Sequence, residues 1–354
     1  MKYLAISDYK IQIGPAGQAL AEILNAGNYS KAVLLVDANS EKFCLPQFAS
    51  IDLPIIRIEP GEQQKNIRTC EYIWQQMMAL GMDRHSLLVN LGGGVIGDMG
   101  GFCAATFFRG IPFVQIPTTL LSQVDASIGG KLGIDLNWVK NAVGVFKNPL
   151  AVVVDPQFLK TLPDAELRSG FAEIIKHALI ADAVLWNQLK EIDRLDGVEW
   201  EPILEASLRI KRDVVVEDPF EKGRRKVLNF GHTIGHAIES FVLSAGKPLT
   251  HGEAVAAGMV AESYLSSKYL GLEAACLDEI VQVIKRFYPP IHFTEGDYDA
   301  LLGLMKKDKK NRAGSISFTL LPAIGQASFD QFVSEDSIRE ALDFYLREAE
   351  EMKN

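Results

Sequence analysis

The first half of the chain alternates short apolar runs with amphipathic stretches. Residues 16–24 and 67–80 repeat apolar side chains with the period of a helix face. Around them lie short runs of aliphatic and β-branched residues that are apolar on both faces, which is typical of parallel strands covered by helices. These strands are predicted over residues 32–37, 55–58, 86–90, 113–116 and 151–155. The alternation predicts a doubly wound α/β domain.

After residue 162 the pattern changes to longer amphipathic segments with helical periodicity. Helices are predicted there over residues 164–180, 183–193, 200–216, 233–244, 253–269 and 273–287. A short strand is predicted near residues 316–321, and residues 348–354 are expected to end a solvated helix. We therefore expect an α/β domain over residues 1–160 and a mainly α-helical domain over residues 161–354.

Composition leaves the predicted fold unchanged and argues against several classes of protein. The 354 residues are 48% hydrophobic and carry a net charge of −9, which argues against a uniformly basic nucleic-acid-binding surface but permits a local cationic pocket. The four cysteines show no CxxC spacing and are expected to be buried thiols in a reducing compartment. No secretory signal is visible, and no apolar run approaches the roughly 20 residues that span a bilayer. We expect a cytoplasmic protein that binds neither nucleic acid nor membranes.

A glycine-rich segment, residues 91–98, follows a predicted strand and precedes a predicted helix. Glycines in such a turn let backbone N–H groups approach a pyrophosphate at the helix N-terminus. The spacing is not the GxGxxG fingerprint, so the segment fits either a dinucleotide site or a tight strand–helix turn. Asp37 ends an earlier strand, where it fits either a ribose contact or a cap.

A second polar segment, residues 117–131, begins with two threonines after a strand and ends in Gly-Gly-Lys. Lys131 and the pair Lys140 and Asn141 are candidates for binding a phosphate or a carboxylate. The segment is not a Walker A motif. A glycine-rich turn with solvated lysines would explain the glycines, but not threonine, aspartate and lysine together in one loop.

The candidate metal ligands are a carboxylate and a group of histidines. His232 and His236 are four positions apart on one helix face, and His251 follows 19 residues after His232. Glu173 lies in an apolar helix. Two imidazoles and one carboxylate are a common catalytic zinc set. The sequence leaves open which residues ligate, and Glu173 with His177 is an alternative pair.

Basic residues lie close to these candidates. Lys176 follows Glu173 by three positions, Arg225 precedes Asn229 by four, and Lys211 lies in a predicted helix. Each cation alone would fit a solvated surface charge. Their repeated placement beside candidate metal ligands favours an anionic substrate with several negative groups.

Taken together and in order, these motifs resemble the 3-dehydroquinate synthase family of sugar-phosphate cyclases. The matching segments are residues 61–65, 91–98, 107–110, 117–131, 140–141, 159–163, 170–177, 228–239, 251–259 and 308–311. The resemblance implies a Rossmann-like N-terminal domain that binds NAD, a helical C-terminal domain that binds Zn²⁺ or Co²⁺, and an active site in the cleft between them. It also implies a homodimer.

The resemblance assigns roles by position. The implied metal ligands are Glu173, His232 and His251. The implied NAD contacts are Asp37, Asn39, Glu62, Lys65, Gly94, Val95, Ile96, Gly97, Asp98, Thr118, Thr119, Lys140, Phe158, Leu159, Lys160 and Thr161. The implied substrate contacts are Asp125, Lys131, Asn141, Lys176, Lys211, Arg225, Asn229, His236 and one of Lys309 and Lys310, with Arg109 reaching the partner subunit's site. Of these, Lys131, Asn141, Lys176 and His236 are implied to be catalytic.

The implied reaction converts 3-deoxy-D-arabino-heptulosonate 7-phosphate, a small phosphorylated sugar acid, to 3-dehydroquinate and phosphate in the shikimate pathway. It is a carbon–oxygen lyase reaction with transient oxidation by NAD, phosphate elimination, reduction and an intramolecular aldol closure. The alternatives are a sister cyclase of the 2-epi-5-epi-valiolone or 2-deoxy-scyllo-inosose synthase type, and a metal-dependent polyol dehydrogenase. The cation set Lys131, Lys176, Lys211 and Arg225 favours a phosphorylated acid over a neutral polyol.

Four positions depart from the family pattern. Where the family usually has threonine and asparagine after Gly-Gly-Lys, this chain has Leu132 and Asp135. Val139 replaces a glycine, and Asn148 replaces a glutamine. Because the substrate-contacting cations persist, we expect a divergent lineage with the same substrate.

Overall fold

A computed structural model describes residues 1–48, 51–137, 139–306 and 316–351. Its contacts divide the chain into two compact units. The first unit combines residues 1–163 with residues 200–216, and the second combines residues 164–199 with residues 217–354. One helix from the later part of the chain therefore packs with the N-terminal α/β unit. The domain border that the sequence predicts after residue 160 stays a prediction.

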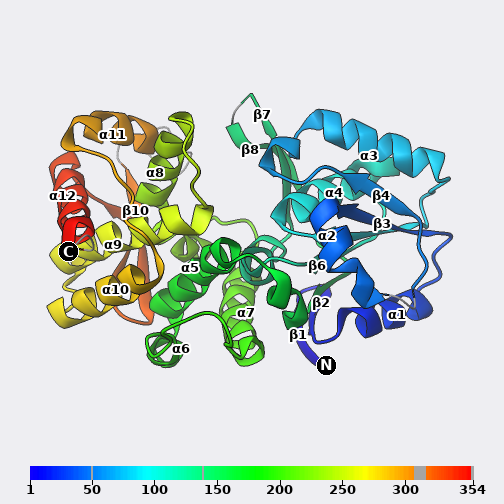
Figure 1. The fold of residues 1–354 in the computed structure, drawn as a ribbon, viewed down its shortest axis with the longest axis horizontal. Coiled ribbons are helices and arrows are strands. Elements are labelled where there is room, and N and C mark those ends of the chain that lie inside the picture. The colour runs from blue at the N-terminus through cyan, green and yellow to red at the C-terminus, as the bar shows by residue number, and fades with distance from the viewer. Residues whose placement is uncertain (49–50, 138, 307–315, 352–354) are drawn as a thin grey trace. The chain divides into compact units, whose positions relative to one another are not determined.

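The first unit is built on a seven-stranded sheet with the order β1-β2-β9-β6-β5-β3-β4 (Figure 1). All neighbouring strands pair in parallel except β1 and β2, which form an antiparallel hairpin at one edge. The five predicted strands are present, and the edge hairpin is an addition to the prediction. The strands are β1 (Lys2–Ile6), β2 (Tyr9–Ile13), β3 (Ala32–Asp37), β4 (Ile55–Ile58), β5 (Leu87–Gly92), β6 (Phe113–Pro117) and β9 (Ala151–Val154).

Helices cover both faces of this sheet. Along β3, Val33 and Leu35 enter a cluster with α3 and α4, whereas Leu34 and Val36 enter a cluster with α1. Strands buried on both faces need this cover, so the doubly wound α/β prediction is confirmed. The helices of this unit are α1 (Ala16–Ala26), α2 (Ala38–Phe43), α3 (Ile67–Ala79), α4 (Gly94–Thr106) and α7 (Trp200–Glu217).

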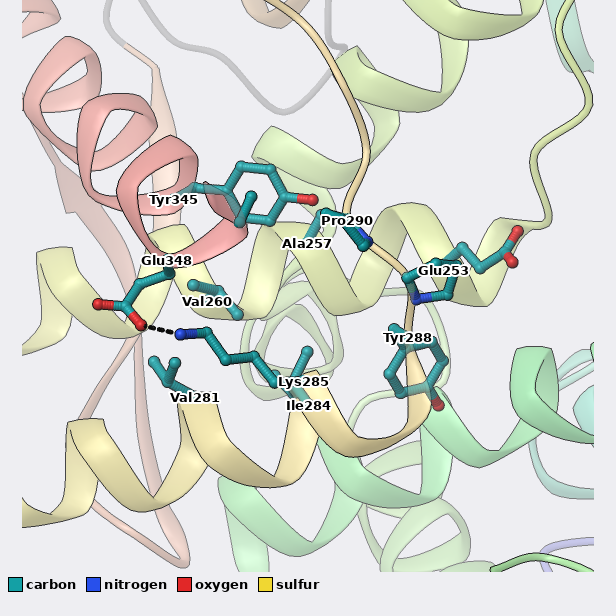
Figure 2. A pocket seen from close by; sticks show the side chains of 12 residues that line it. Glu253, Ala257, Val260, Val281, Ile284, Lys285, Tyr288, Pro290, Tyr345 and Glu348 are labelled. Atoms are coloured by element: carbon teal, nitrogen blue, oxygen red, sulfur yellow. Dashed lines mark hydrogen bonds and ion pairs between the residues drawn. The ribbon is translucent and has the colours of Figure 1, made fainter. Parts of the chain in front are cut away.

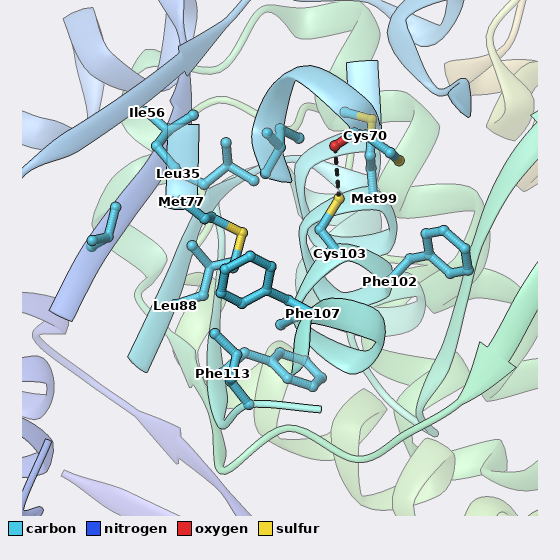
Figure 3. Close-up of a cluster of buried hydrophobic side chains, with 14 of the residues drawn as sticks. Leu35, Ile56, Cys70, Met77, Leu88, Met99, Phe102, Cys103, Phe107 and Phe113 are labelled. Carbon is cyan, nitrogen blue, oxygen red and sulfur yellow. Dashed lines mark hydrogen bonds between the residues drawn. The ribbon is translucent and has the colours of Figure 1, made fainter. Parts of the chain in front are cut away.

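Figure 3 shows the cluster between the sheet and the α3–α4 layer, with two cysteines in it. Cys70 and Cys103 are fully buried, and the Cys103 thiol donates to the Cys70 carbonyl oxygen at 3.9 Å. Burial raises the pKa of Cys103 well above its ordinary value, and the neighbouring Cys70 adds to this. Cys44 is also buried, while Cys276 is half-buried. The described cysteines are therefore free thiols, three of them in cores, as expected.

The segment after the second polar motif forms an antiparallel hairpin, β7 (Lys131–Leu136) and β8 (Val139–Phe146), which the sequence analysis did not predict. Most of β8 is exposed, so the hairpin lacks the continuous apolar pattern of a core strand. Gly133 pairs with Gly144, and a Cβ atom at Gly144 would overlap the carbonyl oxygen of Leu132. The two glycines therefore allow the strands to pair closely.

The second unit is mainly helical, as predicted, and is arranged around α9 (Figure 1). Helix α9 packs against α5, α8, α10 and α12. The predicted β segment is present as the first strand of a hairpin. The elements are α5 (Asp164–Ala181), α6 (Ala183–Leu189), α8 (His232–Ser244), α9 (His251–Leu270), α10 (Ala274–Phe287), α11 (Tyr298–Lys306), α12 (Glu335–Glu351), β10 (Ser317–Ala323) and β11 (Gln326–Phe332).

Short helical turns connect these elements. The 3₁₀ turns include η2 (Glu62–Gln64), η3 (Phe107–Arg109), η5 (Pro156–Thr161) and η6 (Arg224–Asn229), and η4 (Ser122–Ala126) is a π-helical turn. Several of the predicted site residues lie in or beside them. Within the described part of the chain, no helix has the length and apolar character needed to cross a bilayer.

Candidate functional site

The polar residues of the first unit gather at the carboxyl edge of its parallel sheet. Asp37 ends β3, Gly92 ends β5, and Thr118 directly follows β6. Ligands of doubly wound sheets bind at this edge. Asp37 Oδ1 accepts from Ser40 N–H at 2.8 Å and so caps α2. Asp37 therefore caps a helix, which is one of the two roles that the sequence allowed. Its ribose contact stays a prediction.

The glycine-rich turn opens α4 at this edge. The helix begins at Gly94 after Gly93, a residue with no side chain to cap the first-turn N–H groups. Such N–H groups, together with the helix dipole, favour an anion at this end. Thr118 is buried and Thr119 half-buried after the next strand, while Phe158 and Leu159 are buried in η5. Their contacts with NAD stay a prediction.

Lys65 and Asp98 form a buried ion pair beside this turn, with Lys65 Nζ 2.6 Å from Asp98 Oδ2. Burial raises the pKa of Asp98 to about 6, although the Lys65 ammonium opposes the shift. The Lys65 carbonyl oxygen accepts from Asp135 N–H at 2.8 Å, which ties β7 to this pair. Asn39, Glu62, Lys160 and Thr161 are exposed.

Asp98 is expected to make stability depend on pH. Its pKa is about 6 in the folded protein, against about 4 in an unfolded chain, so the folded state binds more protons between these values. The free energy of unfolding is therefore expected to fall as pH rises from about 4 to about 6, by at most about 2–3 kcal/mol. Asp98→Asn is expected to remove this term, which urea denaturation of both proteins without NAD would measure. A wild-type free energy that rises relative to the variant in this window would contradict the prediction.

A second ion pair joins residues far apart in sequence. Lys211 Nζ on α7 lies 2.5 Å from Asp125 Oδ1 in η4, and the Lys211 side chain is almost buried. Lys131, Lys140 and Asn141 lie exposed on the β7–β8 hairpin. Thus the structure joins Asp125 with Lys211 and places the other three residues on a single hairpin. Arg109 is the exposed last residue of η3, and its contact with a partner subunit stays a prediction.

The departures from the family pattern have local structural partners. Leu132 is buried in the α3–α4 core. Asp135 Oδ1 accepts from Asn141 N–H at 2.7 Å, and Asn148 Nδ2 donates to Asp8 Oδ1 at 2.7 Å. Asn141 has a φ of +50°, so this bond holds a backbone conformation that L-residues rarely adopt. Leu132 and Asp135 thus pack or brace the hairpin, Asn148 joins the chain after it to the β1–β2 turn, and Val139 is half-exposed.

In the second unit, three helices bring Glu173, His232 and His251 together. Glu173 Oε1 lies 3.4 Å from His232 Nε2 and 3.5 Å from His251 Nε2. His232 Nδ1 donates to the Phe230 carbonyl oxygen at 3.0 Å, which directs the Nε2 lone pair toward Glu173. Glu239 Oε2 lies 3.6 Å from His251 Nδ1.

Electrostatics distinguish these three groups. Burial raises the pKa of Glu173, but Lys176 and then His232 outweigh it and hold the pKa well below its ordinary value. Burial lowers the pKa of His232 to about 4, and Lys176 adds to this. Burial also lowers the pKa of His251, but its carboxylate neighbours Glu173 and Glu239 raise it to about 9. Without a metal, Glu173 is therefore ionised and His232 neutral at pH 7, the states that ligate a metal, whereas His251 is protonated and would release its proton on ligation.

His236 adds a third imidazole to this cluster. Its ring centroid lies 5.0 Å from that of His232 and 5.7 Å from that of His251. The ligand nitrogens of these three histidines all lie within 4.8 Å of one another. The structure therefore gathers every candidate that the sequence proposed in this group and leaves the choice of three ligands open. His177, the alternative partner of Glu173, is buried on α5.

The donor set fits a zinc or cobalt ion. Glu173 Oε1 is buried without a hydrogen bond, although two imidazole nitrogens face it. A buried carboxylate oxygen left in this way is stabilised by a cation, and oxygen with imidazole nitrogen is the set that Zn²⁺ prefers in catalytic sites. Glu173, His232 and His251 therefore fit such an ion, and their role as its ligands stays a prediction.

The second unit also holds cationic and polar candidates, of which Lys176 contacts this cluster. Lys176 is almost fully buried and forms an ion pair with Glu173. Arg225 is also buried, and its guanidinium donates to the Pro219 carbonyl oxygen at 2.6 Å. Asn229 Nδ2 donates to Glu221 Oε1 at 3.1 Å. Lys309 and Lys310 lie outside the described residues.

Two buried glutamates near the histidines were not predicted as site residues from the sequence. Glu239 is on the same helix as His232 and faces His251. Glu262 lies on α9 and accepts from backbone N–H groups at the start of α8. The available signal was an acidic residue inside an otherwise small and apolar helical run, which a folded protein buries only with partners.

Helix α9 also borders a crevice with α10 and α12, shown in Figure 2. Its lining combines apolar side chains with Glu253, Tyr288 and Lys285, and Lys285 Nζ lies 2.5 Å from Glu348 Oε2. The space amounts to about 20 Å³, enough for about one water molecule. It cannot hold a sugar phosphate, so the histidine cluster remains the candidate site of the second unit.

Comparison with protein families matches most of the chain. Residues 55–169 match the 3-dehydroquinate synthase N-terminal model, and residues 170–311 match the 3-dehydroquinate synthase C-terminal model. The 3-dehydroquinate synthase of Parabacteroides distasonis is 45% identical over 332 residues, which cover 92% of this chain and 94% of the relative. The enzyme of the same name from Streptococcus pneumoniae is 38% identical over 353 residues, covering 96% and 97%.

A solved structure agrees with the fold. The 2-epi-5-epi-valiolone synthase of Streptomyces hygroscopicus, solved with NAD⁺ and Zn²⁺ bound, matches 98% of this chain and 99% of its own with a TM-score of 0.85 and 27% identity. The family models cover well over half of the residues, and the sequence relatives match nearly end to end. This chain belongs to the 3-dehydroquinate synthase family.

Proposed function

We propose that this chain is a 3-dehydroquinate synthase, an NAD- and metal-dependent lyase that converts 3-deoxy-D-arabino-heptulosonate 7-phosphate to 3-dehydroquinate and phosphate. The observation that carries the proposal is the convergence of Glu173, His232 and His251, with the buried cation Lys176 paired to Glu173. The identity of 38–45% with relatives of that name supports it.

Glu173, His232 and His251 would hold the metal, and the carboxyl edge of the first unit's sheet would bind NAD. When bound, NAD supplies reversible hydride transfer, and Zn²⁺ or Co²⁺ lowers the pKa of the substrate hydroxyl that is oxidised. The proposed NAD site includes the open N-terminus of α4 and the Lys65–Asp98 pair.

This chain's side chains would move the proton and compensate the charge. We assign His236 to relay the hydroxyl proton, because it is one turn from His232 and its ring lies among the candidate ligands. We assign Lys131, Asn141 and Lys176 to the substrate phosphate, and Arg225 to its other negative groups. Buried cations act more strongly on an anionic substrate than exposed ones, because water screens them less.

A sister cyclase is the second candidate, because the solved 2-epi-5-epi-valiolone synthase matches the whole fold. The identity of 38–45% with 3-dehydroquinate synthases, against 27% with the 2-epi-5-epi-valiolone synthase, favours the first candidate. We further propose a homodimer in which Arg109 reaches the partner subunit's site. The cytoplasmic location stays a prediction.

Phosphate release from three substrates tests the proposal. With NAD and Zn²⁺, we expect release from 3-deoxy-D-arabino-heptulosonate 7-phosphate, and none from sedoheptulose 7-phosphate or glucose 6-phosphate. A chelator should abolish release, and Zn²⁺ or Co²⁺ should restore it. No net NADH should accumulate, because the cofactor is recycled in each turnover. Release from only one of the other two substrates would assign a sister cyclase, and net NADH with glycerol would assign a polyol dehydrogenase.

A further inference from the structure

Helix α8, which carries His232 and His236, begins without a capping side chain of its own. The residue at the N-cap position is Gly231, with a φ of +78°. A carboxylate from another helix takes the capping place. Glu262 Oε2 on α9 accepts from Gly231 N–H at 2.7 Å, and Glu262 Oε1 accepts from Ile234 N–H at 3.0 Å.

This arrangement is favourable at the start of a helix. The first N–H groups of a helix lack partners within it and form the positive end of its dipole, so a carboxylate stabilises them. Glu262 is fully buried, and the two hydrogen bonds compensate part of its lost hydration. The bonds reach the residues on either side of His232, one before it and one two positions after it.

Glycines bring the two helices close enough for this contact. A Cβ atom at Gly258 on α9 would overlap the carbonyl oxygen of Gly231, and one at Gly235 would lie 2.8 Å from the carbonyl oxygen of Ala254. The backbones of α8 and α9 therefore touch at these positions. Because both carboxylate oxygens of Glu262 are engaged, rotation or sliding of α8 along α9 would break at least one bond.

We propose that Glu262 is a positioning residue for the metal site: it fixes the start of α8 on α9, so that His232 and His236 face His251. Glu262 and His251 belong to the same helix, so the clamp sets the position of two histidines relative to the third. The inference rests on the proposed function, in which these histidines serve the metal and the proton relay.

Glu262→Gln tests this role. Glutamine keeps the volume and one acceptor oxygen, but its NH₂ group would face one of the two N–H donors. We expect the variant to fold, to bind Co²⁺ roughly 10–100-fold more weakly, and to show a changed visible spectrum of bound Co²⁺. The value of kcat should fall more than KM changes, and NAD affinity should stay at the wild-type level. Glu262→Ala loses both bonds and should show larger changes of the same kind.

Glu273→Gln is the matched control, because Glu273 is an exposed glutamate just after the end of α9. It should leave Co²⁺ affinity and the spectrum unchanged. A Glu262→Gln protein with lowered Tm but wild-type Co²⁺ affinity and spectrum would overturn the positioning role. If the variants do not fold, hydrogen exchange in the wild-type protein decides, since rapid exchange of Gly231 and Ile234 amides would also overturn it, and slow exchange is expected.

The two proposals fail in different ways. A wild-type protein that binds Co²⁺ but releases phosphate from no sugar phosphate would contradict the proposed function and leave the metal measurements on Glu262 valid. An active enzyme whose Co²⁺ spectrum is insensitive to Glu262→Gln would contradict only the positioning role.

Discussion

The Glu173→Ala variant is expected to lose tightly bound metal and to lose turnover by at least about 10²–10³-fold, the loss typical of one electrostatic group in a catalytic site. Glu173 is the carboxylate among the three assigned ligands, and its Oε1 faces both His232 Nε2 and His251 Nε2. Its removal leaves two neutral or cationic imidazoles without an anionic ligand. It also leaves Lys176 buried without this partner, and breaking a buried ion pair costs about 3–5 kcal/mol.

Metal content after dialysis, phosphate release and NAD titration measure the outcome together. NAD affinity should persist, because its proposed contacts lie in the first unit. Glu173→Gln keeps the volume of the side chain and should give the same metal loss with a smaller effect on stability. Glu166→Ala, an exposed position in the first turn of the same helix, is the control and should retain metal. Wild-type metal content in Glu173→Ala would disprove the ligand assignment.

Gly258→Ala is expected to lower the free energy of unfolding of the second unit. The added Cβ atom would overlap the carbonyl oxygen of Gly231 and lie 2.7 Å from Gly235 N. Both neighbours are backbone atoms, which cannot rotate away as a flexible side chain would. Overpacking in a core costs about 1–3 kcal/mol and sometimes more, and the displaced α8 should also weaken metal binding.

Replacing Gly303 by alanine should instead raise the free energy of unfolding. Gly303 lies within α11, and a Cβ atom there meets nothing within 4 Å. Alanine in a helix interior is favoured over glycine by about 0.5–1 kcal/mol, so Gly303→Ala should stabilise the protein. Urea denaturation of the metal-free proteins compares the two variants. If Gly258→Ala and Gly303→Ala had equal free energies of unfolding, the backbones of α8 and α9 could move apart at little cost, and the prediction would be wrong.

Much of the fold could be predicted because its strands are apolar on both faces. Residues 32–37 and 55–58 coincide with β3 and β4, where helices cover both sides of the sheet. The β7–β8 hairpin could not be predicted in this way. Its second strand is mostly exposed, and its pairing depends on the close approach allowed by Gly133 and Gly144. Periodicity reports burial, so it misses a strand such as β8, whose side chains are mostly exposed.

The histidine cluster could be predicted from the spacing of its residues and from the resemblance to a family. The spacing of His232 and His236 places them on one helix face, and their donor types made His251 and Glu173 further candidates. The resemblance then selected Glu173, His232 and His251 as the ligands. The partners Glu239 and Glu262 were not predictable, since their contacts depend on how α8 and α9 pack. The Lys65–Asp98 pair likewise joins positions 33 apart, which no spacing rule connects.

The position of the candidate ligands on separate helices has a consequence for how the protein folds. Glu173 comes from α5, His232 from α8 and His251 from α9, so the unfolded chain holds no preformed chelate. A metal ion can gain its full affinity only after these helices have docked, which places its stabilising effect late in folding. Metal supply would then act mainly by slowing unfolding and would leave the rate of folding nearly unchanged. In a cell short of zinc, the enzyme would be lost through faster opening of its second unit rather than through failure to reach the native state.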